Sequence, residues 1–203
     1  MGLKIATVAA KVRRAVFQDA FFSVWSKLEI VKTNELATFE ELTRWIDDEL
    51  RSTETLLGFY QDGDWAALFD VGQCRIADEQ ELCLLSERVG PVIAALGHTT
   101  SSTYWFKLYE QGYLRRRICS DDGDLVTEGE PVAHGGSLDL PRFWLTDVEH
   151  LLESFGLQPY VAECKGPFVA IEVVDVVDNK RACEPPAVAT PPAKRKRPWW
   201  KMW

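Results

Sequence analysis

Acidic side chains are the groups of this chain with the clearest capacity for recognition, and they gather at two places. One group lies near residue 48 and the other at residues 121–130; together they comprise Asp47, Asp48, Glu49, Asp121, Asp122, Asp124, Glu128 and Glu130. Such carboxylates keep a protein soluble, and they also attract basic partners, because complementary charge speeds encounter and aids specificity. We treat these eight residues as candidates for binding a basic protein partner.

A second unusual segment is KRKRPWWKMW at residues 194–203, which we call the basic tail. Tryptophan favours the membrane interface, and each Lys or Arg beside anionic lipid contributes about 1 kcal/mol. The tail therefore predicts weak contact with an anionic membrane, or docking on an acidic surface of a partner, of its own domain or of a second copy. The residues expected to make these contacts are Lys194, Arg195, Lys196, Arg197, Trp199, Trp200, Lys201 and Trp203.

The charges are distributed unevenly along the chain. Residues 178–203 contain seven of the 23 Lys and Arg but only two of the 31 Asp and Glu, so this segment carries +5. The total of −8 therefore leaves −13 on residues 1–177. Such an acidic body repels phosphate backbones, and four cations alone bind nucleic acid weakly and in a salt-sensitive way. We expect no nucleic-acid partner.

Recognisable catalytic motifs are absent from the sequence, which contains no GxGxxG, P-loop, GxSxG, HExxH or paired CxxC. Cys164 and His150 can meet in space as nucleophile and base, but a buried cysteine and an exposed helical histidine are the better interpretation. The stretch DDGD at residues 121–124 has its Gly at the third position instead of the sixth, which favours a hairpin turn over a calcium loop. We expect no catalysis, no metal and no cofactor.

The cysteines indicate a reduced compartment, because they are odd in number and lack metal-ligand spacing. The apolar run at residues 5–10 is too short for a secretory signal, and no stretch has the length of a membrane span. We expect a cytoplasmic protein whose cysteines act as small core residues. They are Cys74, Cys83, Cys119, Cys164 and Cys183.

Three segments carry the signals of amphipathic helices, at residues 38–50, 78–90 and 146–156. A fourth helix, at residues 14–27, lacks a capping residue, and a strand there is the alternative. The expected N-terminal pairs are Thr38 with Glu41, Asp78 with Glu81 and Thr146 with Glu149.

Short apolar or alternating runs between these helices predict strands. They lie near residues 3–10, 55–60, 65–71, 91–98, 102–111, 113–120, 125–132 and 167–177. Hairpins interrupted by helices predict an α+β fold, in which a mostly antiparallel sheet carries three to four helices on one face. We expect one acidic domain at residues 1–177, a Pro/Ala-rich linker at 178–193 and a flexible basic tail at 194–203.

The order of features between residues 64 and 132 carries a resemblance. The stretches DWAALFDV, ELCLLSERVGPVIAALG, STYWFKLYEQGYLRRRICS and EGEPV resemble a loose class of small uncharacterised bacterial α+β proteins, over about a third of the chain. Several members of that class resemble immunity proteins of polymorphic toxin systems, which are cytoplasmic, acidic, non-enzymatic proteins that bind and block a cognate toxin. The resemblance implies a scaffold and transfers no functional residue.

These observations together predict a non-catalytic bacterial protein that occludes a basic partner such as a toxin. One alternative is a membrane-peripheral or assembly adaptor that works through the basic tail. The other is an enzyme with an unrecognised site, which requires a deep pocket where His, Cys or carboxylates converge with perturbed pKa values. The sequence leaves the oligomeric state open.

Overall fold

One antiparallel sheet of nine strands organises the chain in the computed structural model, which describes residues 3–48, 56–132 and 142–176. The strand order is β2-β9-β3-β4-β1-β5-β6-β7-β8. The strands are β1 (Leu3–Ala10), β2 (Leu28–Leu36), β3 (Leu56–Asp62), β4 (Trp65–Asp70), β5 (Val92–His98), β6 (Thr103–Glu110), β7 (Tyr113–Asp121), β8 (Asp124–Gly129) and β9 (Phe168–Asp175). The helices are α1 (Arg14–Val24), α2 (Phe39–Asp48), α3 (Glu79–Val89) and α4 (Leu145–Ser154), with short 3-10 turns η2 (Arg75–Ala77) and η3 (Val161–Glu163).

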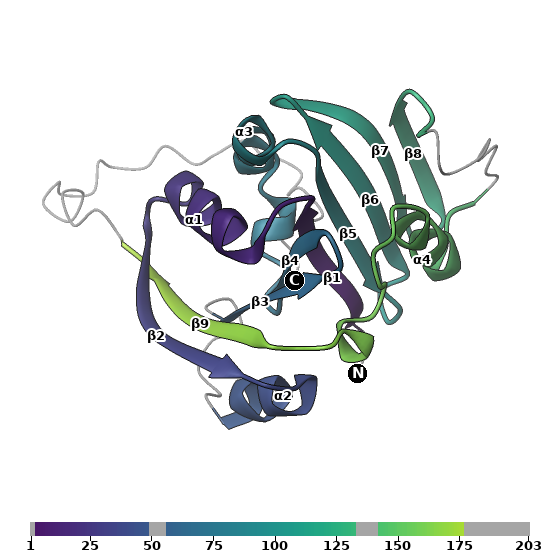
Figure 1. Cartoon of the computed structure of the whole chain (residues 1–203). Helices are drawn as coiled ribbons and strands as arrows, with labels where there is room; N and C mark the ends of the chain where they lie inside the picture. Colours follow the sequence, from purple (N-terminus) through teal and green to yellow (C-terminus); the bar gives the residue numbers. More distant parts are fainter. Residues whose placement is uncertain (1–2, 49–55, 133–141, 177–203) are drawn as a thin grey trace, which may run out of the picture.

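Helices cover both faces of the sheet (Figure 1). α1 and α3 pack on one face through side chains such as Phe21 and Leu85, and α2 and α4 pack on the other through Leu42 and Leu151. The α+β prediction is confirmed, whereas the prediction that the helices share one face is wrong.

The middle strands explain the second helical layer. In β1, Ile5 and Ala9 face the core beneath α2 and α4, while Ala6 and Val8 face the core beneath α1 and α3. A strand buried on both faces needs an unbroken apolar run instead of an alternating one. Such runs occur at TVAA in β1, WAAL in β4 and VIAAL in β5.

The predicted helices form close to their expected positions, and α1 resolves the helix-or-strand alternative at residues 14–27 in favour of helix. The Thr38 cap of α2 is confirmed, because the Thr38 hydroxyl accepts a hydrogen bond from the Glu41 N–H at 3.2 Å. This bond satisfies one of the backbone donors that a helix start leaves unpaired.

The caps of the other two predicted helices differ from expectation. The Asp78 side chain does not cap α3; its carboxylate accepts a hydrogen bond from the indole N–H of Trp25 at 2.9 Å. α4 begins before Thr146, and the Asp147 carboxylate accepts the N–H of Trp144 at 2.7 Å. Tertiary packing therefore determines the partner of Asp78, whereas Asp147 forms a local capping contact that lies earlier in the chain than Thr146 would place it.

No strand is expected at residues 28–36, yet β2 forms there. It pairs with β9 at one end of the sheet, and six of its nine residues are exposed. An edge strand with little burial on either face shows no apolar period, so the sequence does not reveal it.

The turn at residues 121–124 is a hairpin turn between β7 and β8, as predicted. Its central residues both have positive φ, 48° at Asp122 and 94° at Gly123, which identifies a type I′ turn. The linker and the basic tail predicted at residues 178–203 lie outside the described residues. In the described part of the chain, no helix has the length and apolarity needed to cross a bilayer.

Candidate partner-binding surface

The side chains of β6, β7 and β8 that lie on the α3 side of the sheet form a surface that we call the open face. Residues paired directly across antiparallel strands point to the same side, which produces three rows. α3 packs over β5 and β6 and reaches β7, but every residue of β8 except Leu125 is exposed. The rows are Thr103–Asp121–Asp124, Trp105–Cys119–Val126 and Lys107–Arg117–Glu128.

Ion pairs connect α3 to the open face. The Glu79 carboxylate, in the first turn of α3, accepts hydrogen bonds from the Lys107 ammonium at 2.7 Å and from the Arg117 guanidinium at 2.6 Å. Arg117 also contacts Glu128 on β8 at 3.0 Å. The Lys107 nitrogen lies 4.7 Å from the centroid of the Trp105 ring. Two cations and two carboxylates balance, so this network holds the open face in place without adding net charge.

The network perturbs the ionisation of Glu79. Burial disfavours the charged carboxylate, but the hydrogen bonds and positive charges of Lys107 and Arg117 outweigh burial and lower its pKa. Glu79, Lys107 and Arg117 are not among the partner-binding residues predicted from the sequence. The signal that the sequence offers is the run RRR at residues 115–117, of which Arg117 pairs with Glu128 and Arg115 pairs with Glu110.

The acids of the β7–β8 hairpin differ in their exposure and in whether they already contact other side chains. Asp122, Asp124 and Glu130 are exposed and have no ion pair within the described residues. Glu128 is exposed but paired with Arg117, while half-buried Asp121 accepts a hydrogen bond from the Thr103 hydroxyl at 3.0 Å. Asp122, Asp124 and Glu130, which we call the edge acids, therefore carry the uncompensated negative charge of the hairpin.

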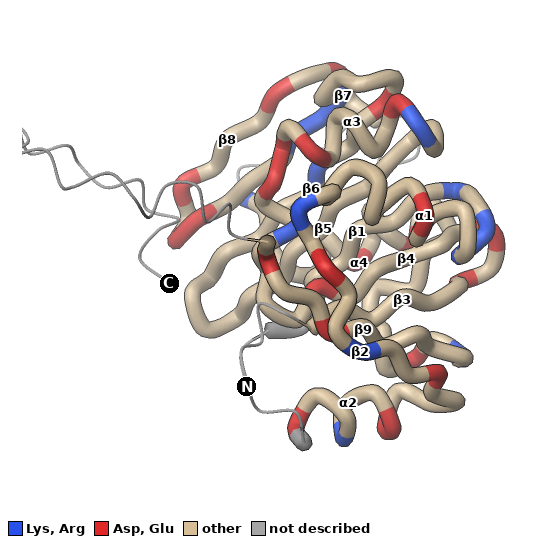
Figure 2. The backbone as a smooth tube through the Cα atoms, turned by 90° about the vertical axis from the view of Figure 1, so that its left-hand side faces the viewer, with Lys and Arg blue, Asp and Glu red and all other residues tan. Residues whose placement is uncertain are grey.

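The other predicted acidic group does not join this surface. Asp47 and Asp48 end α2, which packs beside β2 and β9 at the opposite end of the sheet from β8. Asp47 is exposed, while Glu49 and the Asp48 side chain lie outside the described residues. Figure 2 shows the acidic segments of α2 and β8 at opposite ends of the molecule. One partner surface of ordinary size cannot easily contact both groups.

The open face also offers apolar and backbone groups. Val126 is 50% exposed and lies in the same row as half-buried Trp105 and Cys119. Burial raises the pKa of the Cys119 thiol to about 11, so it stays neutral. The outer edge of β8 has no neighbouring strand in the described chain, which leaves its outward N–H and C=O groups available to an extended peptide.

The geometry gives no support to Cys164 as a nucleophile. Cys164 is buried, and burial raises the pKa of its thiol to about 12, so the reactive thiolate does not form near neutral pH. The thiol lies 3.8 Å from the Tyr160 carbonyl oxygen, while His150 is exposed on α4. The expected pattern of a buried cysteine and an exposed histidine is confirmed.

A histidine and a serine do meet in the turn between β5 and β6. The Ser101 hydroxyl lies 2.9 Å from His98 Nδ1 and 2.9 Å from the Thr103 hydroxyl, which in turn bonds to Asp121. The Ser101 backbone N–H also points to His98 Nδ1 at 3.2 Å. Because the same nitrogen closes the turn through the backbone, we assign this chain of bonds to holding the turn against β7.

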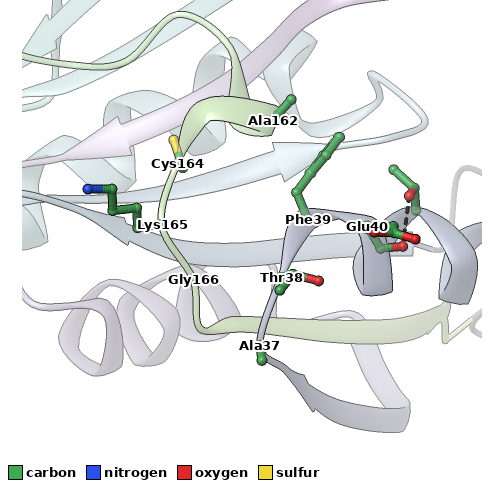
Figure 3. Close-up of a pocket in the computed structure, with 9 residues that line it drawn as sticks. Ala37, Thr38, Phe39, Glu40, Ala162, Cys164, Lys165 and Gly166 are labelled. Atoms are coloured by element: carbon green, nitrogen blue, oxygen red, sulfur yellow. Dashed lines mark hydrogen bonds between the residues drawn. The ribbon is translucent and has the colours of Figure 1, made fainter.

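The two best-formed depressions in the described chain are open to solvent, and no histidine lines either. One, of about 660 Å³, lies between the start of α2 and the segment before β9. Figure 3 shows Lys165 and Glu40 on opposite sides of it, so its charged groups do not converge. Across the described residues, no three His, Cys, Asp or Glu side chains gather in a way suited to a metal ion.

Asp70 is a buried carboxylate with a structural role. It is 1% exposed and accepts hydrogen bonds from the N–H groups of Arg75 at 2.7 Å and Ile76 at 3.0 Å, which closes the loop between β4 and α3. Burial raises its pKa to about 6. Its place at the base of a packed loop makes it a stability group that titrates near neutral pH.

Comparison with known proteins adds no relative to this picture: no protein-family model, no curated protein and no solved structure matches the chain. The open face and its edge acids, described from geometry and charge, therefore carry the functional argument.

Proposed function

We propose that this chain is a non-catalytic, immunity-like binding protein, which occludes a basic protein partner through the open face and the edge of β8. The observation that carries the proposal is the outer edge of β8, which has no neighbouring strand in the described chain and bears half-exposed Val126. The exposed edge acids accompany it, with Asp122 in the turn before the strand, Asp124 at its start and Glu130 just after its end. The cytoplasm of a bacterium is the setting in which such a protein acts on a toxin-like partner.

The chemistry of the surface favours a basic partner. Lys107 and Arg117 are already neutralised by Glu79 and Glu128, so a partner meets the negative field of the edge acids. Opposite charge on the partner accelerates encounter, and like charge excludes wrong partners. The same carboxylates discourage two copies from pairing edge to edge, because their charges repel.

The mechanism is steric. A partner that binds along β8 gains backbone hydrogen bonds from the unpaired edge and apolar contact from Val126, while its cations meet the edge acids. No bond is made or broken, and one chain blocks one partner for as long as the complex lasts. Ion pairs link Glu79 on α3 to Lys107 on β6 and to Arg117 on β7, and Arg117 to Glu128 on β8, so α3 and the three strands are connected before the partner arrives.

The test compares two variants with the same change in charge. One neutralises the edge acids by Asp122→Asn, Asp124→Asn and Glu130→Gln, and the control neutralises exposed acids at the other end of the sheet by Glu29→Gln, Glu35→Gln and Asp47→Asn. Each chain is co-expressed with the products of neighbouring genes, and the affinity of any complex is measured by titration at low and high salt.

We expect the edge variant to lose at least about tenfold in affinity at low salt, with a smaller difference at high salt, and the control to bind as the parent does. Equal weakening by both variants, or by neither, contradicts the proposed surface. Turnover of a small molecule by the purified chain, with no protein partner recovered, contradicts the proposed function itself.

A further inference from the structure

We infer that the basic tail of the same chain, Lys194–Trp203, binds the open face and occupies the edge of β8 when no partner is present. The inference rests on the proposed function only in assigning the same surface. It adds a second ligand for that surface and a form of regulation, because the tail and a basic partner then compete.

The open face and the basic tail are complementary because they carry opposite charges and both present apolar groups. Asp122, Asp124 and Glu130 are exposed without ion pairs in the described chain, and the tail begins with four consecutive cations. Half-exposed Val126 lies between the carboxylates of Asp124 and Glu128 on β8, and three tryptophans follow the tail's cations. An extended peptide places alternate side chains on opposite sides, so cations and aromatic groups can both reach the open face.

The length of chain between the domain and the tail is sufficient. The Val176 N–H donates to the Lys27 carbonyl oxygen at 2.8 Å, which fixes the departure point beside β2 and β9. Seven strand spacings separate β9 from β8 in the sheet order, or roughly 34 Å at about 4.8 Å each. Residues 177–193 span up to about 50 Å at ~3.1 Å per residue, so the tail reaches β8 around the sheet.

Tethering makes even weak contact effective. A short tether gives its ligand an effective concentration on the order of 1 mM, so an intrinsic dissociation constant of about 100 µM leaves the site ~90% occupied. A basic partner then binds about tenfold more weakly than it binds a chain with an inactive tail, because only the unoccupied fraction is competent. The charge of −13 on residues 1–177 opposes the alternative of an anionic membrane.

The test uses the full chain without any partner. A carbodiimide joins Lys194, Lys196 or Lys201 to carboxylates in contact with them, and mass spectrometry identifies the joined peptides. We expect at least a tenfold excess of links to the edge acids over links to Asp47, Glu29 and Glu35, and loss of this excess near 1 M salt. A variant with Arg195→Gln, Arg197→Gln, Trp199→Ala and Trp200→Ala keeps the lysines, and it is expected to lose the excess and to speed amide hydrogen exchange in β8.

Two further arms of the experiment separate the competing occupants. An equal mixture of ¹⁴N- and ¹⁵N-labelled chains yields links within one label if the tail binds its own domain, and mixed links overturn this in favour of a second copy. Sedimentation with vesicles containing about one fifth phosphatidylserine, accompanied by loss of the links, overturns it in favour of membrane. Equal linkage to all exposed carboxylates overturns the inference that the tail binds the open face. Binding of a basic partner to the open face is measured separately by titration, so failure of this inference and failure of the proposed function are distinguishable.

Discussion

The middle of the sheet and its β8 end use the same antiparallel pairing but differ in what covers them. β1, β4 and β5 lie between two helical layers, and their apolar side chains are buried on both faces. β8 is exposed at every residue except Leu125, and its charges are held by ion pairs or left uncompensated. The buried middle of the sheet therefore supplies stability, while the exposed β8 end is where we propose that a partner binds, so substitutions can separate the two.

The largest expected effect comes from the aromatic cluster under α1. Phe59 is fully buried, and its ring contacts those of Phe17, Phe21 and Phe22. Phe59→Ala is expected to reduce the free energy of unfolding by about 3–5 kcal/mol, because it removes buried area and leaves a cavity. Val126→Ala, the control on the open face, is expected to cost less than about 0.5 kcal/mol in the same denaturant titration. Similar losses in the free energy of unfolding for Phe59→Ala and Val126→Ala contradict the division between a stabilising middle and an exposed β8 end.

The second largest effect is a pH dependence from Asp70. Its pKa is about 6 in the folded chain and 3.8 as the ordinary value, so its contribution to stability is full below pH 4 and is lost as the pH rises through 6. The parent is expected to lose about 3 kcal/mol across this interval relative to Asp70→Asn. Urea titrations of both chains at pH 4, 5, 6 and 7 measure the difference, and parallel curves contradict the prediction.

A third prediction concerns Gly129, the most constrained position of the exposed end. A Cβ there would collide with the Arg115 carbonyl oxygen, and φ is +80°. Gly129→Ala is expected to cost about 2–3 kcal/mol, because it combines backbone strain with a clash. Gly123→Ala is the matched control, since its φ is also positive but nothing lies within 4 Å of the added carbon. We expect faster hydrogen exchange of β8 in the first variant; equal stability of the two variants contradicts the clash.

The smallest expected effect is a pH dependence of stability from Glu79, which has the opposite sign to that from Asp70. The pKa of Glu79 is lowered, so its contribution is present at neutral pH and is lost as the pH falls below about 4.5, opposite to Asp70. Glu79→Gln is expected to cost less than about 1 kcal/mol at pH 7, because the Glu79 side chain is 45% exposed and solvent screens its charge, and less still at pH 3. Glu87→Gln on the same helix is the control. A cost that grows toward low pH contradicts the assignment.

The sequence predicts the parts of the fold that local chemistry determines. The Thr38 cap and the hairpin turn at residues 121–124 depend on neighbours within four residues, and both are found. β2 is exposed on both faces and has no such local signal. Helices on both faces follow from the unbroken apolar runs of the middle strands, because a strand that is apolar on both sides needs cover on both.

The candidate surface likewise has features that the local sequence predicts and others that depend on the tertiary structure. The hairpin acids are neighbours in sequence, so their grouping was predictable, and the structure adds that Asp121 and Glu128 are held by Thr103 and Arg117. The separation of Asp47 from β8 depends on the strand order, which no local pattern contains. Glu79 and Lys107 meet only because α3 crosses β6, and this contact spans 28 residues.

The position of β9 between β2 and β3 has a consequence for synthesis on the ribosome. β2 pairs with β9 across more than 130 residues, for example Leu36 with Phe168. At about 5–20 residues per second, the emerging β2 waits on the order of ten seconds for its only described neighbour. During that interval Ile30 and Val31 have no strand beside them, and the charges of Glu29, Lys32 and Glu35 on the same strand oppose premature association with other chains.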